Sequence, residues 1–310
     1  MRFSAALKRL FIAALAFASW AACAENFLWR VDSLTNHVYL FGTVHAGKAS
    51  WYPMPKAVED AYRDASSLVV EADATNQKAM EEFAPAMTYA PPDSLRKHLS
   101  PGDYDRLLRV LPRYGMHEAQ VAQMKPFIVA SLLVFAEWTR LGYLPQLGVD
   151  TYFIDRAKSE QKPVVELEGV AMQAKLMDSV PDKQAVTLLE GTLDAIEQGL
   201  TGEQIQGVVH SWEVGDTELM LDIARKYDEK VKGAADFEDR FIWSRHDAMM
   251  VKIAAWLDQG NTSRFIAVGA LHLVGPKGLV ERLRQRGYTV RRIFVAPEPA
   301  QGNEGEKKNE

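Results

Sequence analysis

The sequence has 310 residues, of which 47% are hydrophobic and 25% charged, so it is long and apolar enough to form a large globular core. Its formal net charge of -5 disfavours nucleic acid as a partner. The single cysteine, Cys23, excludes intramolecular disulfides and leaves histidine and carboxylate side chains as the strong metal ligands.

The first 24 residues have the pattern of a signal peptide. Three basic residues precede an apolar run from position 10 to position 20, and Ala22-Cys23-Ala24 provides a small-residue cleavage site. Cleavage removes three of the 36 basic residues and none of the 41 acidic ones, which leaves a net charge of -8. We therefore expect an exported protein, periplasmic or secreted, that begins near Glu25.

Cys23 also permits attachment to a membrane. Trp20-Ala21-Ala22-Cys23 loosely resembles a lipobox, in which the cysteine receives a lipid anchor, but a large aromatic residue stands where a leucine-like residue is usual. Ordinary cleavage is the preferred interpretation. The most apolar later stretch, 127–136, is too short to cross a bilayer, so we expect no integral membrane segment in the mature chain.

In the segment 27–71 we predict a β-hairpin whose second strand is followed by a loop, a helix and a further strand. Positions 27–31 and 37–41 are rich in β-forming residues and are separated by turn formers, which indicates two hairpin strands. Gly42-Thr43-Val44-His45 follows the second of them. Pro55 then suits the first turn of a helix, and 67–71 is the next strand.

The middle of the chain is mainly helical over 76–145 and 170–260, with Ser100 as a predicted N-cap. Between these segments, a helix over 149–158 precedes a strand over 163–168. We expect positions 25–296 to form one domain. The remainder, 297–310, has almost no apolar residues and is expected to be disordered.

The final segment, 264–295, repeats the order of elements in the first. A strand ends in Gly269-Ala270-Leu271-His272, a helix is predicted from about Pro276 to Arg286, and a last strand covers 289–295. The predicted fold class is therefore α/β (α+β), with a central mixed sheet built from two strand-GxxH-helix-strand units and flanked by a largely helical insertion.

His45 and His272 are the leading candidates for a functional site. Each follows the end of a strand, where the loops of a parallel sheet converge. Gly42 and Gly269 stand three positions earlier and allow a sharp turn or the close approach of a ligand. One such histidine is more often structural, but two in matching units indicate a site for a divalent metal such as Mn, Co or Zn, which would also need a carboxylate.

Glu71 is the first candidate for that carboxylate. It ends a strand that is otherwise apolar, and burying it there is costly without a cation or a hydrogen-bond donor. Glu168, at the end of the 163–168 strand, is either a site residue or a carboxylate engaged in a cap or an ion pair. Arg245, in an amphipathic helix, could bind a carboxylate or a substrate oxygen, although a surface position is the default.

Three motifs carry a family resemblance, namely Tyr39-Leu40-Phe41-Gly42-Thr43-Val44-His45, Val69-Val70-Glu71-Ala72-Asp73 and Gly269-Ala270-Leu271-His272. In these motifs and their order, the chain resembles the TraB/GumN family, which is related to the Tiki metalloproteases. The resemblance implies a fold related to erythromycin esterase and ChaN-like proteins, and a site formed by His45, Glu71 and His272. Arg245-His246 departs from the Arg-Asn of relatives.

These observations predict a metal-dependent hydrolase that activates water, with a peptide or protein substrate implied by the resemblance. His45 and His272 would hold the metal, and Glu71 would be a further ligand or a general base. No GxSxG, HExxH, P-loop or GxGxxG motif is present. Two alternatives stay open: a protein that binds haem or another small ligand in the same crevice without turnover, and a regulatory module of the cell envelope.

Overall fold

The computed structural model describes residues 24–73 and 75–295. The predicted signal peptide, apart from its last residue, and the predicted tail lie outside the described residues. The strands form a six-stranded sheet. They are β1 (Ala24–Asp32), β2 (His37–Thr43), β3 (Ser67–Val70), β4 (Val164–Glu166), β5 (Arg264–Gly269) and β6 (Thr289–Val295).

The sheet is mixed, with the strand order β4-β3-β5-β2-β1-β6. β4, β3, β5 and β2 run parallel to one another, whereas β1 is antiparallel to both of its neighbours. The two predicted units are β2-α1-β3 and β5-α13-β6, and their first strands, β2 and β5, are neighbours in the sheet. The predicted fold class is confirmed.

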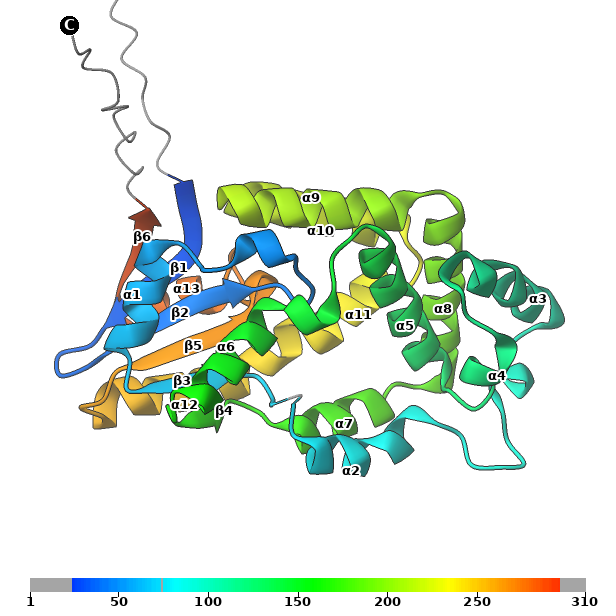
Figure 1. Cartoon of the computed structure of the whole chain (residues 1–310), viewed down its shortest axis with the longest axis horizontal. Helices are drawn as coiled ribbons and strands as arrows, with labels where there is room; N and C mark the ends of the chain where they lie inside the picture. Colours follow the sequence, from blue (N-terminus) through cyan, green and yellow to red (C-terminus); the bar gives the residue numbers. More distant parts are fainter. Residues whose placement is uncertain (1–23, 74, 296–310) are drawn as a thin grey trace, which may run out of the picture.

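Helices account for most of the remaining chain, and long runs of them connect β3 to β4 and β4 to β5 (Figure 1). The α-helices are α1 (Lys56–Asp64), α2 (Gln77–Met87), α3 (Pro101–Val110), α4 (Glu118–Val121), α5 (Pro126–Arg140), α6 (Val149–Ser159), α7 (Val170–Asp178), α8 (Asp182–Glu197), α9 (Leu200–Val214), α10 (Thr217–Lys230), α11 (Ala234–Phe241), α12 (His246–Gln259) and α13 (Leu279–Gln285). The 3₁₀ turns are η1 (Ala49–Trp51), η2 (Leu95–Lys97), η3 (Leu111–Tyr114), η4 (Pro145–Leu147), η5 (Trp243–Arg245) and η6 (Ala270–His272).

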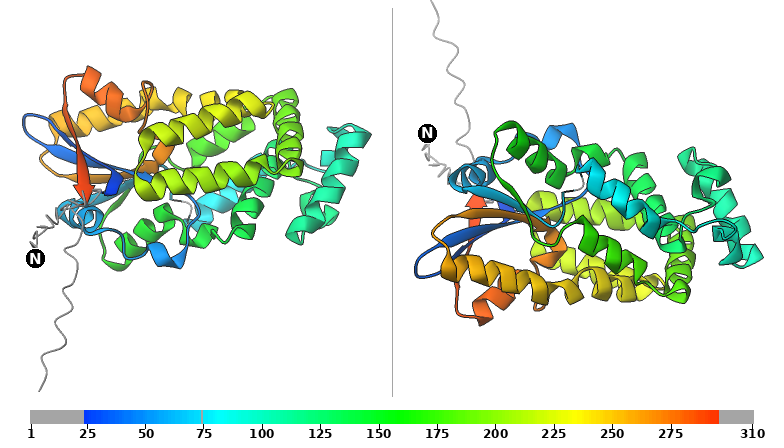
Figure 2. Two further views of the ribbon diagram at one scale, coloured as in Figure 1. Left: turned by 90° about the horizontal axis from the view of Figure 1, so that it is seen from above. Right: turned by 90° about the horizontal axis from the view of Figure 1, so that it is seen from below.

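Two helical layers cover the two faces of the sheet, α1 and α6 on one side and α12 and α13 on the other (Figure 2). Successive side chains of a strand point to opposite faces, so each strand contributes to both layers. On β3, for example, Leu68 and Val70 pack toward α1 and α6, and Val69 packs toward α12. Strands that are buried on both faces need continuous apolar runs, and β3 and β5 have them.

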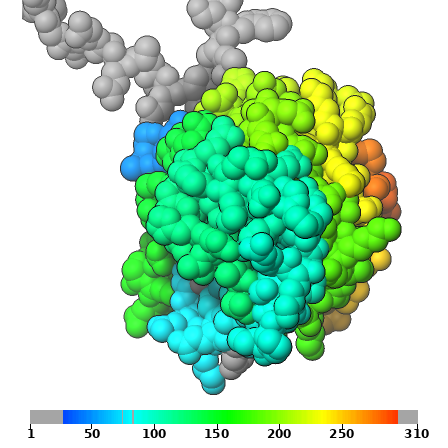
Figure 3. Space-filling model, turned by 90° about the vertical axis from the view of Figure 1, so that its right-hand side faces the viewer, coloured from blue at the N-terminus to red at the C-terminus, as the bar shows by residue number. Residues whose placement is uncertain are grey.

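A second body of helices lies beyond the ends of the parallel strands. α3, α5 and α8 share a separate apolar cluster that includes Leu107, Leu133 and Leu193. The end of the molecule that faces the viewer in Figure 3 is formed largely by the helices that follow β3.

Ser100 caps α3 by accepting a hydrogen bond from the Asp103 N–H, as predicted. Among the described residues, no helix is long and apolar enough to cross a membrane.

One difference from the predicted elements is the late start of α13. The helix was expected from about Pro276, but it begins at Leu279. Gly275 has φ +76°, and Gly278 packs so closely that a side chain there would meet the Val274 carbonyl oxygen. The chain therefore makes a tight turn before the helix can start. β3 ends at Val70, which places Glu71 just beyond the strand.

Candidate active site

Three neighbouring strands bring the predicted site residues to one edge of the sheet. Glu71 follows β3, His272 lies in the turn after β5, and His45 follows β2, and these strands are adjacent in the order β3-β5-β2. Since the three strands are parallel, their carboxyl ends open toward the helical body (Figure 1). Residues 200 or more positions apart in the sequence therefore meet.

Gly269 lies at the centre of these three side chains. Its N–H donates to Glu71 Oε1 over 2.8 Å. A methyl group placed on Gly269 would lie 3.5 Å from both Glu71 Oε1 and His272 Cδ2, and 3.8 Å from His45 Nε2. The absence of a side chain at this position thus leaves a cradle between one carboxylate and two imidazole rings.

Gly42, the matching glycine of the first unit, has a different environment. A side chain at Gly42 would lie 2.9 Å from Phe27 Cβ and 3.0 Å from Ala270 Cα. Its carbonyl oxygen accepts a hydrogen bond from Trp212 Nε1 over 2.8 Å. Gly42 therefore permits close packing of β2 against the turn that carries His272, and it does not border the site directly.

His45 is oriented by Asp150, at the start of α6. The two residues are 2.7 Å apart, Nδ1 to Oδ2, and the other carboxylate oxygen accepts a hydrogen bond from Thr43 Oγ1 at 2.5 Å. Asp150 raises the pKa of His45 to about 9. The His45 side chain is 58% exposed, so it is the member of the site that solvent or a substrate reaches most easily.

Arg245 lies between the two predicted carboxylates. Its Nη2 donates to both Glu71 and Glu168, and its Nε donates to Glu168 Oε1 over 3.0 Å. The side chains are buried, with exposed fractions of 9% for Arg245, 10% for Glu71 and 1% for Glu168. Arg245 is thus a buried residue of the site and not a surface arginine, and Glu168 holds it in place.

The groups around Glu71 determine its ionisation. Burial acts to raise the pKa of the carboxyl, but its interactions with His272, Arg245 and His45 are stronger and hold this pKa well below its ordinary value. Glu71 is therefore a carboxylate at neutral pH.

His272 has a second histidine, His246, as its partner. His246 Nε2 lies 3.0 Å from His272 Nδ1, and His246 Nδ1 lies 2.8 Å from the carbonyl oxygen of Lys277. Burial, followed by the proximity of His272, lowers the pKa of His246 to about 4, so this ring is neutral at neutral pH. No role was predicted for His246 from the sequence, in which its one signal is its position next to Arg245.

These donors are of the type that a divalent transition metal prefers. Glu71 Oε2 and His272 Nε2 are 3.6 Å apart, close to the roughly 3.4 Å expected for two ligands about 2.1 Å from one tetrahedral ion. As the side chains stand, no group of three His, Cys, Asp or Glu in 24–73 and 75–295 is arranged to hold an ion. An ion bound by both atoms would replace their contacts with Arg245, which Glu168 would still retain.

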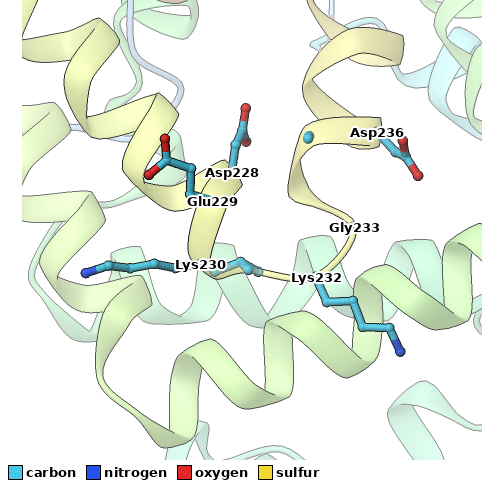
Figure 4. Close-up of a pocket in the computed structure, with 8 residues that line it drawn as sticks. Asp228, Glu229, Lys230, Lys232, Gly233 and Asp236 are labelled. Carbon is cyan, nitrogen blue, oxygen red and sulfur yellow. The ribbon is translucent and has the colours of Figure 1, made fainter.

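Other candidate groups lie outside this cluster. His37 pairs with Asp64 at 2.9 Å, and His98 is within 3.1 Å of Asp93. A pocket of about 390 Å³ between the end of α10 and the start of α11 is lined by charged residues such as Asp228 and Lys232 (Figure 4), but by none of the site residues.

Comparison with known proteins identifies the family. A model of the TraB/PrgY/gumN family matches residues 27–292, which include every member of the site. The chain belongs to the TraB/PrgY/gumN family. No solved structure is significantly similar to the chain.

The relatives of this TraB/PrgY/gumN protein differ in what their names say. "Uncharacterized protein YbaP" of Escherichia coli (strain K12) is 26% identical over 275 residues, which cover 86% of this chain and 96% of the relative. "Metalloprotease TIKI homolog" of Amphimedon queenslandica and "Metalloprotease TIKI2" of Xenopus tropicalis are each 23% identical, over 88% and 89% of this chain and 62% of each relative. The distant similarity to named metalloproteases is consistent with a hydrolase.

Proposed function

We propose that this protein is an exported, metal-dependent hydrolase that cleaves peptides. The convergence of His45, Glu71 and His272 on the cradle at Gly269 is the observation that supports this proposal most directly. The names of the distant relatives add support for peptide cleavage. Because fold similarity does not by itself establish a reaction, the site chemistry has the greater weight.

The three side chains would act as ligands of a metal ion. His45 Nε2, Glu71 and His272 Nε2 would hold a divalent ion such as Mn, Co or Zn, and that ion would polarise the scissile carbonyl and acidify a water molecule. Glu71 suits ligation better than proton abstraction, because a general base works best with a pKa near the working pH and the pKa of Glu71 is far lower.

Arg245 and Asp150 keep the site residues in position. Arg245 neutralises Glu71 in a buried setting, where an uncompensated carboxylate would be costly. Asp150 accepts the hydrogen bond of the His45 Nδ1–H, so that Nε2 faces the cradle, where a bound ion would replace the Nε2 proton. Access for a peptide would come from the side of His45, which is the exposed member of the site.

The test is a metal-dependence assay on the purified protein. The protein is stripped with a chelator, reloaded separately with Mn, Co and Zn, and assayed against a peptide library. We expect cleavage only after reloading, and a loss of at least about 100-fold in kcat/KM for Glu71→Ala and His272→Ala. His98→Ala, which removes a hydrogen-bonded histidine away from the site, is the matched control. Cleavage that survives His272→Ala would refute the proposal, as would a protein that neither binds metal nor cleaves peptide.

Export is tested separately. The protein recovered from the periplasm or medium should begin at Glu25 by N-terminal sequencing and have the mass of the unmodified chain from there. A blocked N-terminus at Cys23 with added lipid mass would show membrane anchoring instead. A cytoplasmic protein that keeps its first 24 residues would contradict export.

A further inference from the structure

A buried line of hydrogen-bonding groups runs from Arg245 to the main chain at Lys277. Arg245 Nη1 is 3.2 Å from His272 Nε2, His272 Nδ1 is 3.0 Å from His246 Nε2, and His246 Nδ1 is 2.8 Å from the Lys277 carbonyl oxygen. Arg245, His246 and His272 are 9%, 0% and 2% exposed. Water is largely excluded, so each ring nitrogen must be satisfied by its neighbour in the line.

The acceptor at Lys277 sets the direction of the line. A carbonyl oxygen only accepts, so the proton of the contact at Lys277 must be on His246 Nδ1. The buried, neutral His246 ring then has its lone pair on Nε2, and His272 Nδ1–H donates to it. At the other end, His272 Nε2 faces both the donor Arg245 Nη1, at 3.2 Å, and the acceptor Glu71 Oε2, at 3.6 Å.

Both ends are held rigidly. Arg245 Nη1 also donates to the Phe241 carbonyl over 2.7 Å, and Arg245 Nε donates to Glu168. At the other end, the Gly278 N–H donates to the Gly275 carbonyl over 3.0 Å and closes the turn that presents Lys277. Because neither end can rotate to exchange donor for acceptor, the order of protons from Lys277 to His272 Nδ1 is fixed.

We propose that His246 is a positioning residue that holds a proton on His272 Nδ1 and thereby leaves Nε2 as the nitrogen that faces Glu71 and the cradle. The proton on Nδ1 follows from the hydrogen bonds to His246 and Lys277. Its use, in holding a metal ion, rests on the proposed function.

A histidine suits this position because it accepts a hydrogen bond without adding charge. Second residues that orient a site histidine are often carboxylates. Here one cation, Arg245, is already shared by two buried carboxylates, Glu71 and Glu168, and a third buried carboxylate would lack a counter-charge. The neutral His246 ring provides the acceptor and passes the remaining hydrogen bond to the Lys277 carbonyl.

Imidazole ¹⁵N NMR of the full chain, labelled on histidine and free of metal, tests the tautomer directly. The His272 signals are assigned by their loss in His272→Gln. We expect His272 Nδ1 to resonate as a protonated nitrogen. This signal should be lost in His246→Leu and retained in His246→Gln, because the glutamine carbonyl can take the place of Nε2 as acceptor.

Lys277→Ala is the matched control, since it changes the side chain and keeps the carbonyl that His246 contacts. Its spectrum should equal that of the wild type. A wild-type His272 with a bare Nδ1 would overturn the proposal, and so would an unchanged Nδ1 signal in a folded His246→Leu. If His246→Leu does not fold, the wild-type tautomer and the His246→Gln spectrum still decide the matter.

Titration with Zn²⁺ alone tests whether the position of the His272 proton affects metal binding at the site. We expect Zn²⁺ to shift the His272 Nε2 resonance while Nδ1 keeps its proton, and His246→Leu to bind Zn²⁺ about 10- to 100-fold more weakly. Wild-type-like Zn²⁺ affinity in a folded His246→Leu would overturn the positioning role. If the tautomer is as expected but the wild type binds no metal, the proposed function fails while the assignment of His246 to the tautomer stands.

Discussion

The Gly269 N–H donates to Glu71 Oε1 over 2.8 Å, and this bond joins the end of β5 to the residue that follows β3. This hydrogen bond holds the Glu71 carboxylate at the edge of the sheet, beside the turn that carries His272. The glycines of the two Gly-x-x-His motifs therefore have different roles. Gly269 borders the three site side chains, whereas Gly42 allows close packing against Phe27 and Ala270.

Alanine substitutions should separate these two glycines. Gly269→Ala adds a methyl at ordinary contact distance from its neighbours and should fold with near wild-type stability, yet lower metal affinity and kcat/KM by filling the cradle. Gly42→Ala places a methyl 2.9 Å from Phe27 Cβ and should destabilise the protein by about 1–3 kcal/mol. Urea unfolding and activity assays of both variants measure the contrast, and equal effects in both would contradict it.

Arg245→Met should be among the most destabilising single changes in the site. It leaves Glu71 and Glu168 buried without their shared cation, which should cost about 3–5 kcal/mol in the free energy of unfolding. Adding Glu168→Gln removes one of the two charges and should restore part of the loss. Urea unfolding at pH 7 gives both values. A single-variant loss below about 1 kcal/mol, or no recovery in the double variant, would show that the ion cluster is not strongly coupled.

Asp150→Asn should change His45 without altering the fold. Asn keeps the shape of Asp150 but removes the charge that raises the pKa of His45 to about 9, so this pKa should fall toward the ordinary 6.5. NMR titration of the His45 ring measures the shift, and kcat/KM should fall about 10- to 100-fold. Thr43→Val removes only the hydroxyl that contacts Asp150 and serves as the control. An unchanged His45 titration would contradict the pairing.

The pocket in Figure 4 supplies a test of pH-dependent stability at Asp228. Burial, and then repulsion from Glu238, raise the pKa of Asp228 from 3.8 to about 7. A carboxyl whose pKa is raised by folding makes its full contribution to native-state stability below its unfolded pKa, and this contribution is lost as the pH rises from about 4 through 7. The loss is on the order of 1–3 kcal/mol after allowance for solvent screening.

Asp228→Asn should therefore raise the melting temperature at pH 8 more than at pH 5. The neutral amide can still donate to Glu238, and it removes the repulsion that develops at high pH. Glu229→Gln, an exposed neighbour that lines the same pocket, makes the same change in net charge and should show no such pH dependence. Equal stabilisation by both variants at both pH values would refute the explanation.

Strong local signals in the sequence were sufficient to predict much of the sheet. The last strand was expected over 289–295, and β6 covers Thr289–Val295. The strand after the first helix was expected over 67–71, and β3 ends one residue earlier. Apolar runs bounded by turn residues predict such strands well, because burial on both faces requires them. The start of α13 was expected too early, at about Pro276, because Gly275 and Gly278 form a tight turn that delays the helix to Leu279.

By itself, the sequence determined the family motifs, the pairing of two Gly-x-x-His turns and the candidates His45, Glu71 and His272, because each of these depends on neighbours close along the chain. Only the tertiary structure decided what surrounds them. Asp150 lies 105 residues from its partner His45, and Arg245 lies 174 from Glu71. Such contacts depend on the order of strands and the packing of helices onto the sheet, so a buried arginine and the His246–His272 pair emerge only when the chain is folded.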